Sequence, residues 1–178
     1  MDRKTVVFLP LVKTSQKFRD ILCGFGFRAA EVNGESPDRA QTLAAFERGD
    51  YNVLCNSMLL TEGWDCPSVD CIVVLRPTKV RSLYSQMVGR GTRLFPGKDH
   101  LLLLDFLWHT ERHELCHPAH LICESEEVAQ RMTENIEAAG CPVDIEEAEK
   151  TASDDVVAAR EEALAKQLQE MKRRKRKL

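Results

Sequence analysis

The 178-residue sequence predicts an α/β fold with a mainly parallel sheet, because two patterns recur along it. Apolar runs of strand length alternate with segments in which apolar residues return at helical spacing. The runs are almost continuously apolar, which is typical of strands that helices cover on both faces. We therefore expect a three-layer domain with the sheet in the middle, followed by C-terminal helices.

The expected strands are rich in β-branched and aliphatic residues and end at turn residues. They cover residues 5–10, 28–32, 51–55, 71–75 and 100–106. Helices are expected between them. One, over 15–23, stops at Gly24-Phe25-Gly26, and another, over 36–49, begins with a proline and an acid in its first turn.

Composition divides the chain into three expected parts. They are an α/β domain over 1–122, a helical and acidic extension over 123–150, and an amphipathic helix with a basic tail over 151–178. Residues 144–153, from the end of the extension into the last part, are acidic and expected to be exposed. The last part contains no proline or glycine, and its apolar residues keep a seven-residue rhythm.

Charge and cysteine usage restrict the class of protein. The net charge is −3, but residues 172–177 contribute +6, so the rest of the chain carries −9 and can attract nucleic acid only locally. The seven cysteines form no C-x-x-C pair and lie mostly in or beside apolar runs, which is typical of reduced intracellular proteins. With no signal-like start and no long apolar window, we expect a soluble cytoplasmic protein without membrane contact.

The segment that carries most chemistry runs from Gln86 to Arg93, with the sequence QMVGRGTR. It begins as a helix after the apolar strand at 71–75, and a three-residue spacing places Arg90 and Arg93 on one face of such a helix. Arginine suits a phosphate group because its guanidinium is always charged and donates two parallel hydrogen bonds.

This segment resembles motif VI of superfamily 2 helicases, Q-x-x-G-R-x-x-R. The upstream Thr61-Glu62-Gly63-Trp64-Asp65 resembles their motif V. DEAD/DEAH-type and restriction-helicase-like members are most similar, and the resemblance covers about residues 5–108. It implies the second, C-terminal RecA-like domain of an ATP-dependent helicase or translocase.

The resemblance also implies roles for individual residues around ATP. Arg90 and Arg93 would reach the γ-phosphate of an ATP held by a partner RecA-like domain, and Gln86 would position that phosphate or its attacking water. Gly63 and Asp65 would lie near the ribose. The Mg²⁺ ion would be held by the partner domain, and we expect no metal site in this chain.

Contacts to DNA or RNA are implied for a second group of residues. Ser57 matches the hydroxyl residue that touches the nucleic-acid backbone, and Gly34, Arg39 and Lys13 would add phosphate contacts. Binding loops of parallel sheets gather at the carboxyl ends of the strands, where we expect all of these residues.

The sequence contains no G-x-x-x-x-G-K-[ST] loop for the ATP phosphates. Residues 91–98 (GTRLFPGK) have one residue too many and are followed by Asp99, and no D-E-x-H or D-E-x-D segment is present. We therefore expect this chain to provide half of an ATP site and to be inactive alone. The other half would come from an N-terminal RecA-like domain, in a longer protein or in a separate subunit.

Several other interpretations stay open. The chain could be a non-enzymatic helicase-like module that binds nucleic acid or protein. A generic nucleotide-binding domain would not explain both motifs. Trp64 is more typical of an apolar plug than of a base-stacking platform. A zinc site is a further alternative at His109, His113, Cys116, His117 and His120. Because the cluster lacks two arms that each carry a pair of ligands, a connecting segment after the last strand is favoured.

Overall fold

The computed structural model describes residues 3–57, 64–106, 115–116 and 118–175, with side chains up to residue 169 in the last helix. The chain forms two compact units, one over residues 1–117 and one over 118–178. The sequence had suggested a division after residue 122. Residues 61–63 of the segment that resembles motif V, and His109 and His113 of the weighed zinc cluster, lie outside the described residues.

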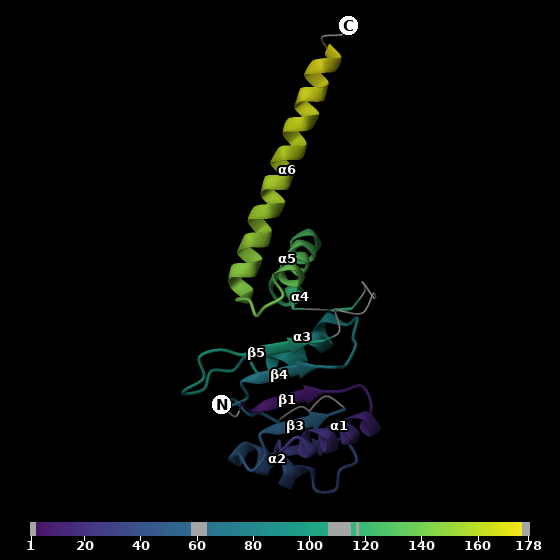
Figure 1. Ribbon diagram of the computed structural model, residues 1–178, viewed down its shortest axis with the longest axis vertical. Coiled ribbons are helices and arrows are strands. Elements are labelled where there is room, and N and C mark those ends of the chain that lie inside the picture. Colours follow the sequence, from purple (N-terminus) through teal and green to yellow (C-terminus); the bar gives the residue numbers. More distant parts are fainter. Residues whose placement is uncertain (1–2, 58–63, 107–114, 117, 176–178) are drawn as a thin grey trace. The chain divides into compact units, whose positions relative to one another are not determined.

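The first unit is built on a five-stranded sheet in which every pair of neighbours is parallel. Its strands are β1 (Thr5–Phe8), β2 (Ala29–Val32), β3 (Val53–Asn56), β4 (Cys71–Val74) and β5 (Leu102–Asp105), in the spatial order β2-β3-β1-β4-β5 (Figure 1). Each strand lies within or next to its predicted range. The predicted parallel sheet is confirmed.

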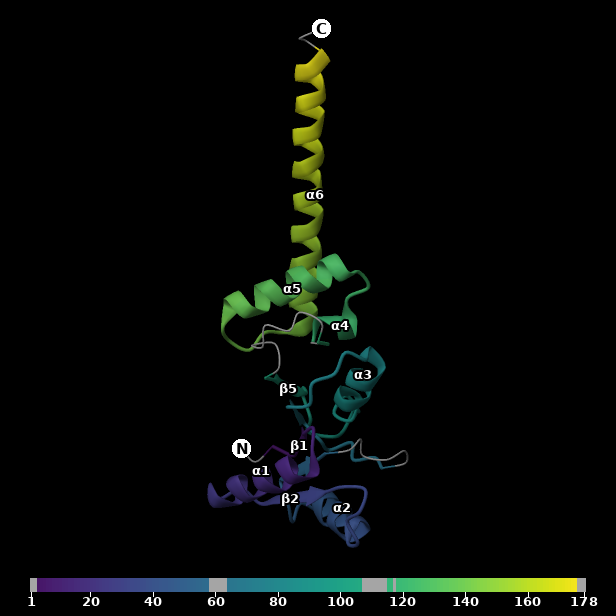
Figure 2. The same cartoon turned by 90° about the vertical axis from the view of Figure 1, so that its right-hand side faces the viewer.

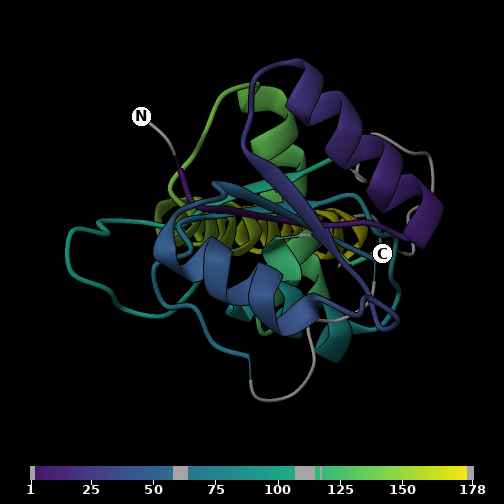
Figure 3. The ribbon, with the colours of Figure 1, turned by 90° about the horizontal axis from the view of Figure 1, so that it is seen from below.

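Three helices cover the two faces of this sheet. They are α1 (Val12–Gly24), α2 (Arg39–Arg48) and α3 (Arg81–Gly89). Helix α1 lies on one face, and α2 and α3 lie on the other (Figures 2 and 3). The arrangement gives the expected three layers, because β1, β2 and β4 are each followed by a helix that crosses back along the sheet.

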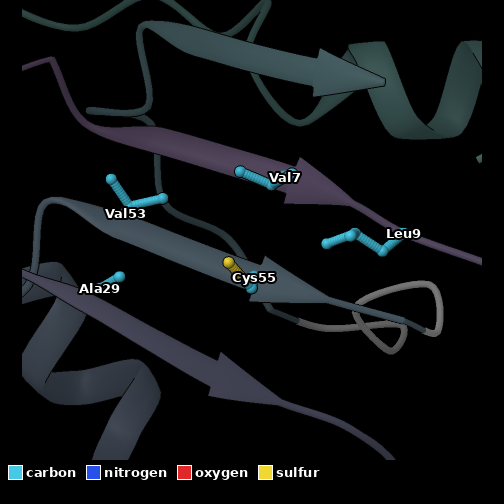
Figure 4. Packing of buried hydrophobic residues seen from close by; sticks show 5 residues of the cluster. All are labelled: Val7, Leu9, Ala29, Val53 and Cys55. Carbon is cyan, nitrogen blue, oxygen red and sulfur yellow. The ribbon is translucent and has the colours of Figure 1, made fainter. Parts of the chain in front are cut away.

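The core follows from the alternation of side chains along the strands. One cluster consists of Val7, Leu9, Ala29, Val53 and Cys55, and Phe18 and Leu22 of α1 pack against it (Figure 4). Their neighbours, such as Phe8 and Leu54, point to the other face and are as deeply buried. Burial raises the pKa of the Cys55 thiol to about 12, so this cysteine behaves as a small apolar core residue.

The second unit is helical and consists of α4 (Ala119–Ile122), α5 (Glu126–Ala139) and α6 (Ile145–Lys175). Its core is the cluster Ala119, Cys123, Ala129, Met132 and Ala152. Ser125 caps α5 by accepting a hydrogen bond from the Val128 amide at 3.2 Å. Helix α5 packs on the first part of α6, which continues well beyond it (Figures 1 and 2).

Helix α6 begins earlier than the sequence suggested. The Asp144 carboxylate accepts hydrogen bonds from the amides of Glu146 and Glu147 at 2.9 and 3.1 Å, so it caps the helix at this point. The expected exposed acidic stretch at 144–153 is therefore mostly helical, and Ala152 on its inner face is fully buried. None of the helices in the described ranges is long and apolar enough to cross a membrane.

Candidate functional site

The predicted site residues divide between two opposite edges of the sheet. Lys13, Gly34, Arg39 and Ser57 follow the carboxyl ends of β1, β2 and β3. Segment 64–67 instead precedes the start of β4, and the segment after α3, which we call the arginine loop (residues 90–98), precedes the start of β5. The expectation that all site loops share the carboxyl edge was wrong, because α3 runs back along the sheet and ends at the amino edge.

The two arginines do not share a helix face. Helix α3 ends at Gly89, with Arg90 as its cap, and the Gly91 amide donates to the Val88 carbonyl oxygen at 2.9 Å in a tightened last turn. Leu101 and Ile72 pack directly against Gly91, so that an added Cβ would lie 2.5 Å from Leu101 Cδ1 and 2.9 Å from Ile72 Cγ1. The predicted helical spacing therefore fails after Arg90, and Arg93 lies beyond the helix.

Both arginines are instead held by segment 64–67. Arg90 is partly buried, and its Nη1 donates to the Trp64 carbonyl oxygen at 2.6 Å. Arg93 Nη1 forms an ion pair with Asp65 Oδ2 at 2.9 Å, and both of these side chains are about half exposed. The structure thus brings together the two motifs that the sequence analysis singled out. Gln86 lies exposed on α3, and Gly63 lies outside the described residues.

Trp64 is the apolar plug that the sequence favoured. Its side chain is buried, and its ring centroid lies 6.2 Å from that of Phe46 in α2. The indole Nε1 donates to Glu47 Oε1 at 2.9 Å, which satisfies its only polar group. The plug anchors segment 64–67 to α2, so the acceptors for Arg90 and Arg93 are attached to the core.

Helix α3 is itself anchored by a buried polar contact. The hydroxyl of Tyr84 donates to Asp105 Oδ2 at 2.6 Å, and both residues are buried. Burial, and then the charge of Asp105, raise the pKa of Tyr84, so the phenol remains a donor. This contact joins α3 to the end of β5. No motif in the sequence indicated it, because its partners are separated by 21 residues.

Lys98 is a further residue that the sequence analysis did not assign to the site. Its ammonium donates to the carbonyl oxygens of Gly91 and Arg93 at 2.5 and 2.8 Å, and it reaches the Pro67 carbonyl oxygen at 3.4 Å. The glycine-rich stretch that resembles an incomplete phosphate loop therefore uses its lysine within the chain. Burial lowers the pKa of Lys98.

The carboxyl edge carries the residues expected to contact nucleic acid. Lys13 is exposed near the start of α1, and Arg39 is the first residue of α2. Gly34 lies in a turn in which the Asn33 side chain accepts from the Glu35 amide at 2.8 Å. Lys13 thus follows β1, whereas Gly34 and Arg39 belong to the connection from β2 to α2 at the same edge.

Ser57 lies at the end of β3 and is almost fully buried. Its hydroxyl has no hydrogen-bond partner among the residues that the structure describes, whereas its carbonyl oxygen accepts from Arg76 Nη1 at 2.9 Å. Arg76 follows β4, so its side chain reaches past the end of β1 to β3. The sequence analysis missed this arginine because it belongs to no motif that was weighed.

Two of the five candidate zinc ligands, Cys116 and His120, lie among the described residues. Within the described ranges, no group of three or more His, Cys, Asp and Glu side chains could hold a metal ion. Cys116 is buried in the first unit, and His120 forms a long contact with Glu126 in the second. His109, His113 and His117 lie outside the described residues.

Comparison with known proteins identifies the family. The helicase conserved C-terminal domain matches residues 1–94, which is more than half of the chain. A putative ATP-dependent helicase of Saccharomyces cerevisiae, IRC3, is 47% identical over 70 residues, covering 39% of this chain and 10% of that protein. A putative mitochondrial ATP-dependent helicase of Schizosaccharomyces pombe, irc3, is 40% identical over 104 residues, covering 57% and 17%. The chain thus spans at most about a sixth of either relative.

Solved structures show the same fold. The C-terminal domain of the DEAD-box protein Dbp5 superposes with a TM-score of 0.51 at 20% identity, over 58% of this chain and 61% of that one. Domain 2 of the DEAD-box helicase Mss116p, bound to an RNA duplex, gives 0.50 at 21% identity, over 75% and 47%. These likenesses show the fold, and the match over residues 1–94 shows that the chain belongs to the helicase conserved C-terminal domain family.

Proposed function

We propose that this chain completes the ATP site of a superfamily 2 helicase or translocase by presenting Arg90 and Arg93 to an ATP bound on a partner RecA-like domain. The observation that carries the proposal is the joining of both arginines to segment 64–67 at the amino edge. Two guanidinium groups close together on a half-exposed surface suit the charge that develops on a γ-phosphoryl group during transfer.

The contacts of Arg93 suit a residue that changes partner. An ion pair between exposed side chains contributes about 0–1 kcal/mol, so Arg93 can leave Asp65 at small cost when a phosphate arrives. The bidentate hydrogen bonds of an arginine to a phosphate are among the stronger polar contacts in proteins. Asp65, once released, is free to accept from a hydroxyl group, as expected for a residue near the ribose.

Arg90 has a different role in the proposal. It is partly buried and bound to the Trp64 carbonyl oxygen, so its position is set before ATP arrives. A preorganised charge needs no rearrangement during the reaction, which is the condition under which electrostatic stabilisation is most effective. Gln86, exposed on α3, would orient the phosphate or the attacking water. Mg²⁺ would fall to the partner domain, because the Asp65 carboxylate is already paired with Arg93.

Nucleic acid is proposed to bind at the carboxyl edge, on the opposite side of the sheet. Lys13 follows β1 there, Gly34 and Arg39 belong to the connection from β2 to α2, and Ser57 follows β3 beside Arg76. Cations and turn amides of this kind contact phosphate oxygens without reading the sequence. Closure on ATP at one edge would move the nucleic-acid contacts at the other edge as a rigid body, which would couple hydrolysis to movement.

A complementation experiment tests this function. ATP hydrolysis is measured for the 178-residue chain alone, and for a fusion in which a RecA-like domain with a phosphate loop and a metal-binding carboxylate precedes it. We expect no turnover by the chain alone and nucleic-acid-stimulated turnover by the fusion. Turnover by the isolated chain would contradict the proposal. A fusion that binds nucleic acid but never hydrolyses ATP would favour a non-enzymatic binding module instead.

A further inference from the structure

We infer that Lys98 is a positioning residue for the arginine pair. Its ammonium joins the arginine loop to segment 64–67 and thereby sets the place from which Arg93 is presented. The consequence for ATP turnover rests on the function proposed above, whereas the effect on the loop does not. The inference comes from the convergence of three backbone carbonyl oxygens on one side chain.

The geometry uses the whole hydrogen-bonding capacity of the ammonium. A lysine has three N–H donors and no acceptor, and Lys98 directs them to Gly91, Arg93 and Pro67. The first two acceptors belong to the arginine loop itself, and the third lies 31 residues earlier in the chain. A single side chain therefore both closes the loop and attaches it to segment 64–67.

Arg93 is consequently held at two points. Lys98 binds its carbonyl oxygen, and Asp65 binds its guanidinium. Without Lys98, the Arg93 side chain would keep its ion pair with Asp65, and a pair between exposed side chains holds an arginine only weakly. Apolar packing offers little at the tip of the loop, because Leu94 is 95% exposed.

The backbone turns just before Lys98 and brings this residue back to the start of the arginine loop. Gly97 has a φ of 81°, a left-handed conformation that glycine adopts without strain, and Lys98 follows it directly. The turn at Gly97 redirects the chain so that the Lys98 side chain reaches residues 91–93. A proline before this glycine and the exposed loop tip make the segment a turn rather than a phosphate cradle.

Lys98 is poorly placed to bind an external phosphate. Its donors are already engaged, and the hollow beside it, lined in part by Arg93 and His100, measures about 140 Å³. Sites for small organic ligands are about 300–1,000 Å³, so this hollow is too small for a nucleotide. The lysine therefore acts on ATP only through the arginine loop.

The first measurement uses the 178-residue chain without ATP. Amide hydrogen exchange is followed by NMR in wild type, in Lys98→Met, which keeps the aliphatic stem without the ammonium, and in Lys17→Met, an exposed control on α1. We expect at least tenfold faster exchange in Lys98→Met alone at the hydrogen-bonded amides of residues 91 and 98, which donate to the carbonyl oxygens of Val88 and Phe95, with α5 and α6 unchanged. Unchanged exchange at both of these amides would overturn the inference, whatever the ATPase assay gives.

A rescue experiment asks whether the ammonium itself is responsible. Lys98→Cys is made in a chain in which the two exposed cysteines, Cys23 and Cys141, are serine. Aminoethylation rebuilds a lysine-like ammonium at residue 98, and carboxamidomethylation adds a neutral group as the matched control. The other five cysteines are buried, and burial raises the pKa of Cys55 and Cys71, so they should not react.

We expect aminoethylation, but not carboxamidomethylation, to restore slow exchange at the amides of residues 91 and 98. The same modified chains, tested in the ATP-hydrolysing fusion, should lose at least tenfold in kcat with little change in the KM for ATP and regain it on aminoethylation. Equal recovery with the neutral adduct would overturn the inference. A loosened loop with normal kcat would also overturn it if Arg93→Ala abolishes turnover. If Arg93→Ala is itself fully active, the proposed function fails, and the loop measurement alone decides the role of Lys98.

Discussion

Gly91 illustrates how one residue can resemble part of a phosphate-binding segment and yet be required for packing. Glycines beside Arg90 allow another surface to approach the backbone closely. The surface that approaches Gly91 is the chain's own core, since Leu101 and Ile72 stand where a Cβ would lie. Gly89, two residues earlier, has nothing within 4 Å of its added Cβ.

This difference gives a matched pair of substitutions. Gly91→Ala should destabilise the first unit by about 1–3 kcal/mol, because the new methyl group overpacks the core. Gly89→Ala should be neutral or stabilise by about 0.4–1 kcal/mol, since α3 accommodates alanine there and the unfolded chain loses freedom. Urea unfolding followed by tryptophan fluorescence measures both variants. Equal stability of the two variants would contradict the packing role.

Single residues were predictable from the sequence where their chemistry is local. Trp64 was expected to be a plug and is one, since a large apolar side chain beside a strand has few other places to go. The lysine at 98 was not assigned, because the carbonyl oxygens that it binds belong to residues that no spacing rule connects. The hydrogen bond between Tyr84 and Asp105 was not predicted for the same reason.

Elements were more predictable than the positions of their ends. The five apolar runs form five strands, and the helices that follow β1, β2 and β4 cross back along the sheet, as parallel pairing requires. The end of α3 was not predictable from helical spacing, because Gly91 must pack against β4 and the segment leading to β5. That single termination moved Arg93 off the helix. The start of α6 depends on Asp144 as a cap. Because Asp144 stands in a run of acidic residues, the sequence does not show which of them is the cap.

The loops at the carboxyl edge give a prediction at the scale of elements. Lys13→Met should weaken binding of single-stranded nucleic acid of any sequence, and should reduce the log-log salt slope by about 0.7. Ser57→Ala should weaken binding without changing the slope, because the hydroxyl carries no charge. Fluorescence anisotropy at several salt concentrations measures both quantities.

The matched control for this experiment is Lys150→Met, which removes an exposed lysine from α6 in the second unit. It should leave both affinity and slope unchanged if the carboxyl edge of the first unit is the binding surface. A larger loss of slope in Lys150→Met than in Lys13→Met would move the nucleic-acid contact away from the loops of the sheet.

At the scale of the whole molecule, the chain belongs to a family of helicase C-terminal domains, and its fold agrees with that membership. The two edges of the sheet give it two surfaces with different chemistry. One carries the arginine pair with its supporting contacts, and the other carries loops with exposed cations. The order of the motifs along the sequence does not predict that these surfaces lie on opposite edges, because their placement depends on the direction in which α3 crosses the sheet.

The central claim is that Arg90 and Arg93 complete an ATP site. The most direct measurement is steady-state ATP turnover by the fusion with a loop-bearing RecA-like domain, comparing Arg90→Ala and Arg93→Ala with Arg48→Ala, which removes an exposed arginine at the end of α2. We expect kcat to fall by about 10³–10⁵ in each of the first two variants and to stay near wild type in the third. Arg→Lys at either position should rescue poorly, because a point charge does not replace a planar fork. Near-normal turnover in both alanine variants, with folding and nucleic-acid binding intact, would contradict the account.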